Sequence, residues 1–198
     1  MRSAISSSFP GRLAKRPQEE SRKMLAHNCN QLQLLGSACR SDKRLFVRVG
    51  SPVGNPKLRS DGGGRGEYGA SRGSRSHKGI DIQTEIGQSV FSPIDGVITR
   101  IGWANSTHRY VEISGQIVLK DLSGQMYQGE ECRVRVMYVK PSANAKEGGL
   151  TRSGEKIGEA DDLHRNGQYP QTVGQHVHVE IVVGDMNIDP EHIVPLSK

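Results

Sequence analysis

Two histidines one residue apart lie in the stretch GQHVHVEI, residues 174–181. A β-strand places alternate side chains on the same face, so His176 and His178 are expected to project together, and the apolar residues between and after them to face the other way. Such a pair suits a metal ion, or a metal ion and its reacting water. The alternative is a half-exposed strand whose polar face carries histidine without a ligand.

A second polar cluster, SHKGID, carries His77 and Asp81 four residues apart with Gly79 between them. Two ligands this close need a backbone that turns sharply or runs near the metal, and glycine permits both. Together with one histidine of the H-x-H strand they make three protein ligands and leave a fourth position open. A mixed set of nitrogen and oxygen donors with an open position is typical of catalytic rather than structural zinc.

The elements that would position these residues are short strands. The sequence contains 24 Gly and 9 Pro with only 5% aromatic residues, which indicates a turn-rich chain. After Ser76, turn residues separate the predicted strand segments SVFSPIDGVITRIG, RYVEIS, QIVLKDL, CRVRVMYVK, EKIGEA and HVHVEIVV. We therefore predict an all-β fold, an antiparallel β-sandwich or open barrel of the barrel-sandwich hybrid type.

The chain changes character twice along its length. Residues 1–50 mix Ser, Arg, Lys and Gln and are predicted to form a flexible N-terminal extension. Residues 51–76 are rich in Gly, Arg and Ser and are predicted to form a loop that leads into the domain. Such a stretch is usually a linker, and the alternative is an ordered loop that passes close to a site. Residues 77–198 are predicted to form the zinc-binding β domain.

Charge, cysteine content and hydropathy exclude several classes of protein. The formal charge of +6 lies largely in residues 1–75, and aromatic and basic residues do not interleave, so specific nucleic-acid binding is not expected. No apolar run is long enough for a membrane span, and no clear signal peptide follows Met1. The three cysteines form no C-x-x-C pair and define no disulfide scaffold; they are Cys29, Cys39 and Cys132.

The motifs HKGID, SPIDGVI, GEKIG and HVHVEI, in this order in an all-strand chain, resemble the lysostaphin and LytM type of zinc metallopeptidase. The resemblance runs from about Gly54 to Pro195. It implies cleavage of peptide bonds in peptidoglycan and a secreted or cell-envelope location. Carried over by position, it implies that Zn²⁺ is held by His77, Asp81 and His178, and that His176 is the catalytic histidine that positions or deprotonates the water.

One position departs from this family pattern. Active members usually carry a second catalytic histidine in a Tyr-x-His strand, and this sequence reads MYVKP, with Lys140 at that place. The segments YVKP, GEKIG and YPQTVGQHVHVE resemble a narrower branch, the leukocyte cell-derived chemotaxin type, which keeps the zinc ligands and has lysine here. The resemblance to this branch implies an alternative function, a zinc-stabilised binding or signalling module without turnover, whose partner would be a protein receptor.

Other polar residues have weaker indications of function. His108 and His164 lie in polar, turn-like sequence and are predicted to be solvated loop residues, with substitution for the missing histidine as the alternative. Glu180 shares a face with His178 and either orients that imidazole or faces solvent. Ordinary surface or loop roles are expected for four further residues, His27, His192, Tyr68 and Arg75.

Overall fold

The computed structural model describes residues 46–47, 49–120, 126–192 and 194–197, within a unit that spans Lys43–Lys198. Most of the predicted N-terminal extension, with His27, Cys29 and Cys39, lies outside the described residues. Within them, the regular structure is β-strand apart from two 3₁₀ turns, η1 (Arg165–Gly167) and η2 (Pro190–His192). The prediction of an all-β, antiparallel fold is confirmed.

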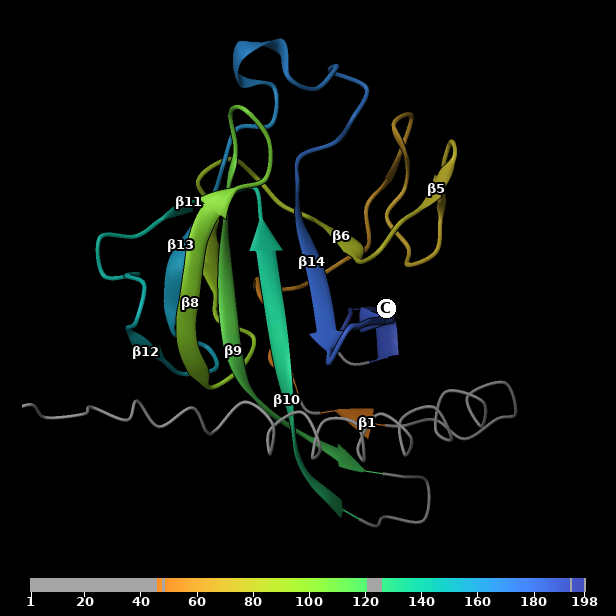
Figure 1. Ribbon diagram of the computed structural model, residues 1–198. Helices are drawn as coiled ribbons and strands as arrows, with labels where there is room; N and C mark the ends of the chain where they lie inside the picture. Colours follow the sequence, from red (N-terminus) through yellow and green to blue (C-terminus); the bar gives the residue numbers. More distant parts are fainter. Residues whose placement is uncertain (1–45, 48, 121–125, 193, 198) are drawn as a thin grey trace, which may run out of the picture. The chain divides into compact units, whose positions relative to one another are not determined.

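A large antiparallel sheet carries the candidate site. Its strands follow the order β12-β8-β9-β10-β14-β15, while β1 pairs with β9 and β6 pairs with β14 (Figure 1). The bounds are β1 (Phe46–Val47), β6 (Ile80–Gln83), β8 (Gly96–Trp103), β9 (Arg109–Lys120), β10 (Met126–Met137), β12 (Leu150–Thr151), β14 (His176–Val183) and β15 (Met186–Ile188).

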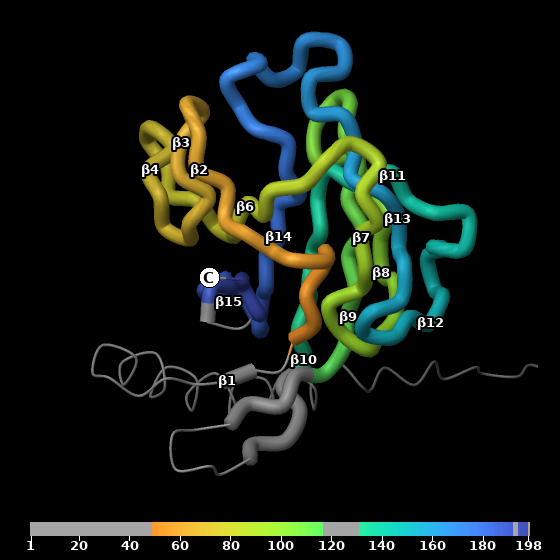
Figure 2. Tube along the Cα trace, turned by 180° about the vertical axis from the view of Figure 1, so that it is seen from behind, coloured from red at the N-terminus to blue at the C-terminus, as the bar shows by residue number. Residues whose placement is uncertain are grey.

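A second sheet of three strands follows the order β11-β13-β7, with β7 (Ser89–Phe91), β11 (Val139–Pro141) and β13 (Lys156–Ala160). It lies over one face of the β8–β9 side of the large sheet, as both views show (Figures 1 and 2). Both sheets contribute fully buried side chains, among them Val90, Ile157, Ile113, Val134 and Val179. Burial of these apolar side chains is the main force that holds the two layers together.

Two small hairpins lie within residues 51–76, the predicted loop. The first pairs β2 (Ser60–Asp61) with β3 (Gly64–Arg65), and the second pairs β4 (Ser71–Arg72) with β5 (Arg75–Ser76). Figure 2 shows both hairpins beside β6 and β14. The segment before β2 is bound to β6, because the amide of Arg59 donates to the carbonyl of Asp81 at 2.9 Å. The hairpins therefore stand next to the strands that carry the predicted ligands.

Two predicted strand boundaries are wrong. RYVEIS and QIVLKDL form one strand, β9, because Ser114, Gly115 and Gln116 all keep partners on β10. A short polar run does not end a strand that the neighbouring strand continues to pair. In contrast, CRVRVMYVK is divided between β10 and β11 at Tyr138, whose φ of 64° is incompatible with extended backbone. The chain thereby passes from the large sheet to the small one.

Candidate metal centre

Strands β6 and β14 position the candidate site. They pair antiparallel in a register that sets Asp81 opposite His178 and Gln83 opposite His176. The alternate residues of both strands are fully buried in the core, including Ile80, Ile82, Val177, Val179 and Ile181, as predicted for β14. Alternation therefore directs the carboxylate and both imidazoles to the other face of the sheet.

Three donor atoms converge at one point. His77 Nε2 lies 2.9 Å from His178 Nδ1 and 3.1 Å from Asp81 Oδ1, and these two atoms are 2.8 Å apart. The three side chains are each at most 8% exposed. Among the described residues they form a cluster with the composition and spacing of a metal site. The structure thus brings together the residues that the sequence predicts as ligands.

The outer nitrogen of each ligand imidazole faces an acceptor. His77 Nδ1 donates to the carbonyl of Glu67 at 2.7 Å, and His178 Nε2 donates to Glu180 Oε1 at 3.2 Å. The inner nitrogens, Nε2 of His77 and Nδ1 of His178, are then free to present lone pairs beside the oxygen of Asp81. Two lone pairs and an anionic oxygen this close repel one another unless a cation lies between them, so the set fits a metal ion.

The charges around the centre favour an ionised carboxylate. Burial by itself raises the pKa of Asp81, but hydrogen bonds to His178 and His77 outweigh it and hold the pKa far below its usual range. Burial by itself lowers the pKa of His178, but hydrogen bonds to Asp81 and Glu180 raise it. A proton and a metal ion therefore compete for Nδ1 of His178, and metal affinity is expected to fall in acid.

His176 lies beside the three ligand atoms without joining them. Its Nδ1 donates to the carbonyl of Gly174 at 2.7 Å, while its Nε2 lies 3.7 Å from Asp81 Oδ1. Burial of the imidazole lowers the pKa of His176 to about 4, so the ring is neutral at neutral pH. A neutral imidazole with a free Nε2 lone pair can accept a proton from a group bound next to the metal.

Two tyrosines that the sequence analysis did not single out for function complete one side of the centre. The ring of Tyr138 packs edge-on against His176, with the centroids 5.3 Å apart, and its hydroxyl lies 2.8 Å from that of Tyr169. Lys140 lies two residues farther along, exposed on β11 opposite Glu159. Tyr138, and not Lys140, has its ring against His176. The backbone of Tyr138 is left-handed, a feature that the sequence does not reveal.

The two other candidate histidines are held by the loops around Tyr169. His108 is fully buried, contrary to the prediction of a solvated residue, because Nε2 meets the carbonyl of Asp162 at 2.9 Å and Nδ1 meets Asn105 Oδ1 at 3.1 Å. His164 is half-buried, and its Nε2 lies 2.9 Å from the carbonyl of Val173. Their ring nitrogens are engaged in loop contacts, and neither histidine belongs to the three-ligand cluster.

Of the remaining residues with predicted minor roles, Tyr68 is bound to the segment that contains Asn187 and Glu191. Its hydroxyl donates to the carbonyl of Asn187 at 3.1 Å, and its amide donates to Glu191 at 2.7 Å. Arg75 is exposed on β5, and Cys132 is a buried free thiol on β10. The side chain of His192 lies outside the described residues.

Gly79 permits the approach of β14 to the His77–Asp81 turn. A Cβ atom at this position would lie 2.1 Å from the carbonyl oxygen of Val179 and 2.9 Å from Nε2 of His178. We expect Gly79→Ala to lower the unfolding free energy by about 1–3 kcal/mol, as overpacking does, and to weaken metal binding. Thermal melts and zinc titration check this. Gly54→Ala, at a position with open space, is the matched control; equal behaviour of both variants would contradict the expectation.

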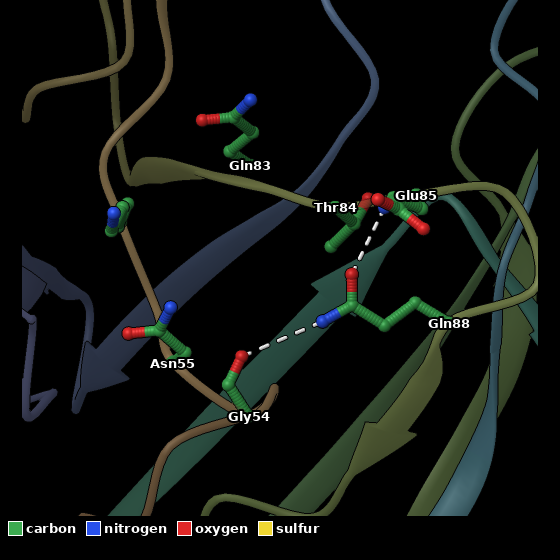
Figure 3. Close-up of a pocket in the computed structure, with 7 residues that line it drawn as sticks. Gly54, Asn55, Gln83, Thr84, Glu85 and Gln88 are labelled. Carbon is green, nitrogen blue, oxygen red and sulfur yellow. Dashed lines mark hydrogen bonds between the residues drawn. The ribbon is translucent and has the colours of Figure 1, made fainter.

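A pocket of about 380 Å³ lies beside β6, lined by residues that include Gly54, Asn55, Gln83, Thr84, Glu85 and Gln88. Figure 3 shows the amide of Gln88 reaching toward Gly54 and toward the backbone of Glu85, while Gln83 points away from Gln88 across the strand. None of these residues belongs to the His77, Asp81 and His178 cluster. The pocket therefore shares no residue with the three-ligand cluster, although its lining residue Gln83 is paired with His176 in the β6–β14 register.

Comparison with known proteins yields matches in family, sequence and fold. The model of peptidase family M23 matches residues 75–190. Leukocyte cell-derived chemotaxin-2 of Bos taurus is 30% identical to this chain over 126 residues, and the match covers 61% of this chain and 69% of that protein. The protein of the same name from Mus musculus is 33% identical over 120 residues, with the same coverage.

A solved structure of Helicobacter pylori Csd3 superposes with a TM-score of 0.52 at 19% identity. The match covers 76% of this chain and 36% of that one, so the chain spans about a third of the length of Csd3. At this level of identity the likeness concerns the fold alone.

Proposed function

The chain belongs to peptidase family M23, and from this membership and the geometry of the centre we propose that it is a zinc-dependent endopeptidase acting on the peptides of peptidoglycan. The observation that carries the proposal is the convergence of His77 Nε2, Asp81 Oδ1 and His178 Nδ1 within 2.8–3.1 Å of one another. Two imidazoles and one carboxylate form a donor set that suits Zn²⁺ with an open position.

When bound, zinc supplies a Lewis acid that acidifies water and polarises a carbonyl group. The residues of the chain supply the rest. Glu67 and Glu180 hold the two ligand imidazoles in one tautomer through their outer nitrogens. His176 accepts the proton of the attacking water at Nε2 and can return it to the leaving amine. The burial of His176 and its contact with Tyr138 keep the ring neutral and fixed in place.

The proposed substrate sets the proposed location. Peptidoglycan lies outside the cytoplasmic membrane, so we propose that the protein acts in the cell envelope or after secretion. In the described part of the chain, no helix is long and apolar enough to cross a membrane.

A second function is favoured by Lys140 and by the two chemotaxin relatives. An ammonium group can donate a hydrogen bond to a developing oxyanion, but beside a cation it cannot shuttle a proton as imidazole does. The relatives are named as chemotaxins, which suits a signalling module that recruits cells. In this alternative the zinc centre stabilises a surface that binds a protein receptor, and peptide hydrolysis is absent.

Digestion of purified peptidoglycan tests the proposal and separates the two functions. We expect the zinc-loaded protein to release free amino groups slowly, and the chelated protein to release none, with mass spectrometry identifying the peptides. A positioned acid or base contributes roughly 100- to 10,000-fold, so Lys140→His is expected to recover a part of that range, about tenfold. If neither the wild type nor Lys140→His cleaves, the endopeptidase proposal fails and the binding module takes its place.

A further inference from the structure

We propose that Arg59 is a positioning residue that fixes both parts of the centre at once. Its guanidinium holds the carboxylate of Asp81 so that one oxygen faces the metal, and through Asp61 it holds the segment that orients His176. This inference rests on the metal centre of the proposed function and is independent of whether the centre hydrolyses peptides.

A continuous set of contacts joins the ligand to the catalytic histidine. Arg59 Nη2 donates to Asp81 Oδ2 at 2.9 Å, and Nη1 donates to Asp61 Oδ1 at 2.5 Å. Asp61 Oδ2 accepts from the amide of Gly174 at 2.8 Å, and the carbonyl of Gly174 holds Nδ1 of His176 at 2.7 Å. Each link is within hydrogen-bond distance, so displacement of Arg59 affects both ends.

The backbone gives Arg59 little freedom. Its amide donates to the carbonyl of Asp81 at 2.9 Å, and its carbonyl accepts from the amide of Gly66 at 2.8 Å. The amide of Asp81 donates to the carbonyl of Gly66 at 2.8 Å, which closes the arrangement. The side chain is only 4% exposed. Arg59 is thus bound to the same segment as the ligand that its guanidinium contacts.

Gly174 is packed against the other end of these contacts. A Cβ atom there would lie 2.6 Å from Asp61 Oδ2, so a larger residue would push the carboxylate away. The close approach permits the amide of Gly174 to bond to Asp61, while its carbonyl faces His176. The position of the catalytic imidazole therefore depends on where Asp61 is held.

The charge and shape of the guanidinium suit Arg59 to hold the two carboxylates of Asp61 and Asp81. An arginine side chain stays charged in proteins, so Arg59 faces Asp61 and Asp81 as a cation. The planar guanidinium bonds the two carboxylates through separate nitrogens in a fixed geometry, and the single nitrogen of an ammonium group does not reproduce that geometry. Because Arg59 and Arg72 both donate to Oδ2 of Asp81, Oδ1 is the oxygen left to face the metal.

Arg72 shares only one of these contacts. Its Nη2 donates to Asp81 Oδ2 at 3.1 Å and to the carbonyl of Arg65 at 2.7 Å, and its side chain is 20% exposed. None of the hydrogen bonds of its guanidinium reaches Asp61 or Gly174. Arg72 therefore supports Asp81 from the side of the β4–β5 hairpin, whereas Arg59 links Asp81 to His176.

Zinc affinity of the full chain, measured by competition with a chromophoric chelator, tests the inference. Loss of an outer partner of a metal ligand commonly weakens metal binding by about 10- to 100-fold, and we expect Arg59→Lys to fall in this range. Arg72→Lys should weaken binding less. Arg65→Lys is the matched control, because it alters an exposed ion pair with Glu67. The cobalt-loaded Arg59→Lys protein should also show an altered visible spectrum, because Asp81 Oδ2 keeps the donor from Arg72 but loses the one from Arg59, and the carboxylate is then held less firmly.

A purely structural role for Arg59 predicts a different result. It would lower the Tm of the metal-free and zinc-loaded forms equally and leave the zinc affinity and the cobalt spectrum unchanged, and this outcome would overturn the inference. If Arg59→Lys does not fold, Asp61→Ala tests the second contact. That variant should speed hydrogen exchange at the Gly174 amide, and unchanged exchange would equally overturn the inference.

The same measurements separate this inference from the proposed function. A wild-type protein that does not bind zinc would refute both. Zinc binding that depends on Arg59, without any peptide cleavage, would refute only the endopeptidase reaction. Zinc binding that is insensitive to Arg59→Lys would refute only the role of Arg59.

Discussion

His178→Ala is expected to abolish stoichiometric zinc binding and to remove the stability that the metal provides. A metal that binds only the native state stabilises it by about 4 kcal/mol when free zinc is near 1,000 times the Kd. For a domain of this size, 1 kcal/mol corresponds to roughly 2–4 °C, so the Tm in zinc should fall by about 10 °C. The same variant in chelator should melt close to the chelated wild type, because only the metal-dependent part is lost.

Metal content by atomic emission and thermal melts with and without zinc are the measurements. His77→Ala is expected to behave in the same way, because its donor atom lies 2.9 Å from that of His178. Asp81→Ala is also expected to lose zinc, but its Tm in chelator should fall as well, because the buried guanidinium of Arg59 loses one of its carboxylate partners. His164→Ala is the matched control, since this half-buried histidine bonds a loop carbonyl and not the centre. If His176→Ala lost zinc as fully as His178→Ala, the roles assigned within the H-x-H strand would be wrong.

The alternating pattern of the last predicted strand was sufficient to predict that its two histidines share one face. HVHVEIVV coincides with β14, and its alternation places His176 and His178 on the face opposite the buried Val177 and Val179. Hydrophobic periodicity is a local property, so it reports on the strand that carries it. The fold class followed from the same signal repeated along the chain.

Contacts between distant segments could not be predicted in this way. Asp81 and His178 are far apart in the sequence, and the pairing register of β6 with β14 brings them together. The contact between Arg59 and Asp81 comes from a segment whose composition indicated a loop. The burial of His108 depends on Asp162, in a loop remote in sequence. Local composition describes how polar a segment is and carries no information on which distant carboxylate or carbonyl will meet it.

Glu180 is one residue whose role could not be predicted from the sequence. Its position on the same face as His178 left two options open, orienting the imidazole or facing solvent. The structure places Oε1 3.2 Å from His178 Nε2 and Oε2 3.5 Å from Arg135 Nη1 on the neighbouring strand. Arg135 lies opposite Glu180 on β10 and helps to hold Glu180 beside the imidazole of His178. No pattern within β14 could indicate this partner.

The second large effect is expected on catalysis. His176→Ala should reduce the rate of peptidoglycan cleavage by about 100- to 10,000-fold, the usual contribution of a positioned general base or acid. Zinc content should change little, because Nε2 of His176 is 3.7 Å from Asp81 Oδ1 and its ring is not one of the three converging ligands. Release of amino groups from cell walls measures the rate, and metal analysis of the same sample measures the occupancy.

Measuring the cleavage rate and the zinc occupancy of His176→Ala together distinguishes a catalytic from a structural histidine. His176 is buried and packs edge-on against Tyr138, so a structural role alone would appear as a lowered Tm with the rate per folded, zinc-loaded molecule preserved. Tyr138→Phe controls for packing, because it keeps the ring beside His176 and removes only the hydroxyl that meets Tyr169. Full cleavage by zinc-loaded His176→Ala would transfer the proton-accepting role to another group at the centre.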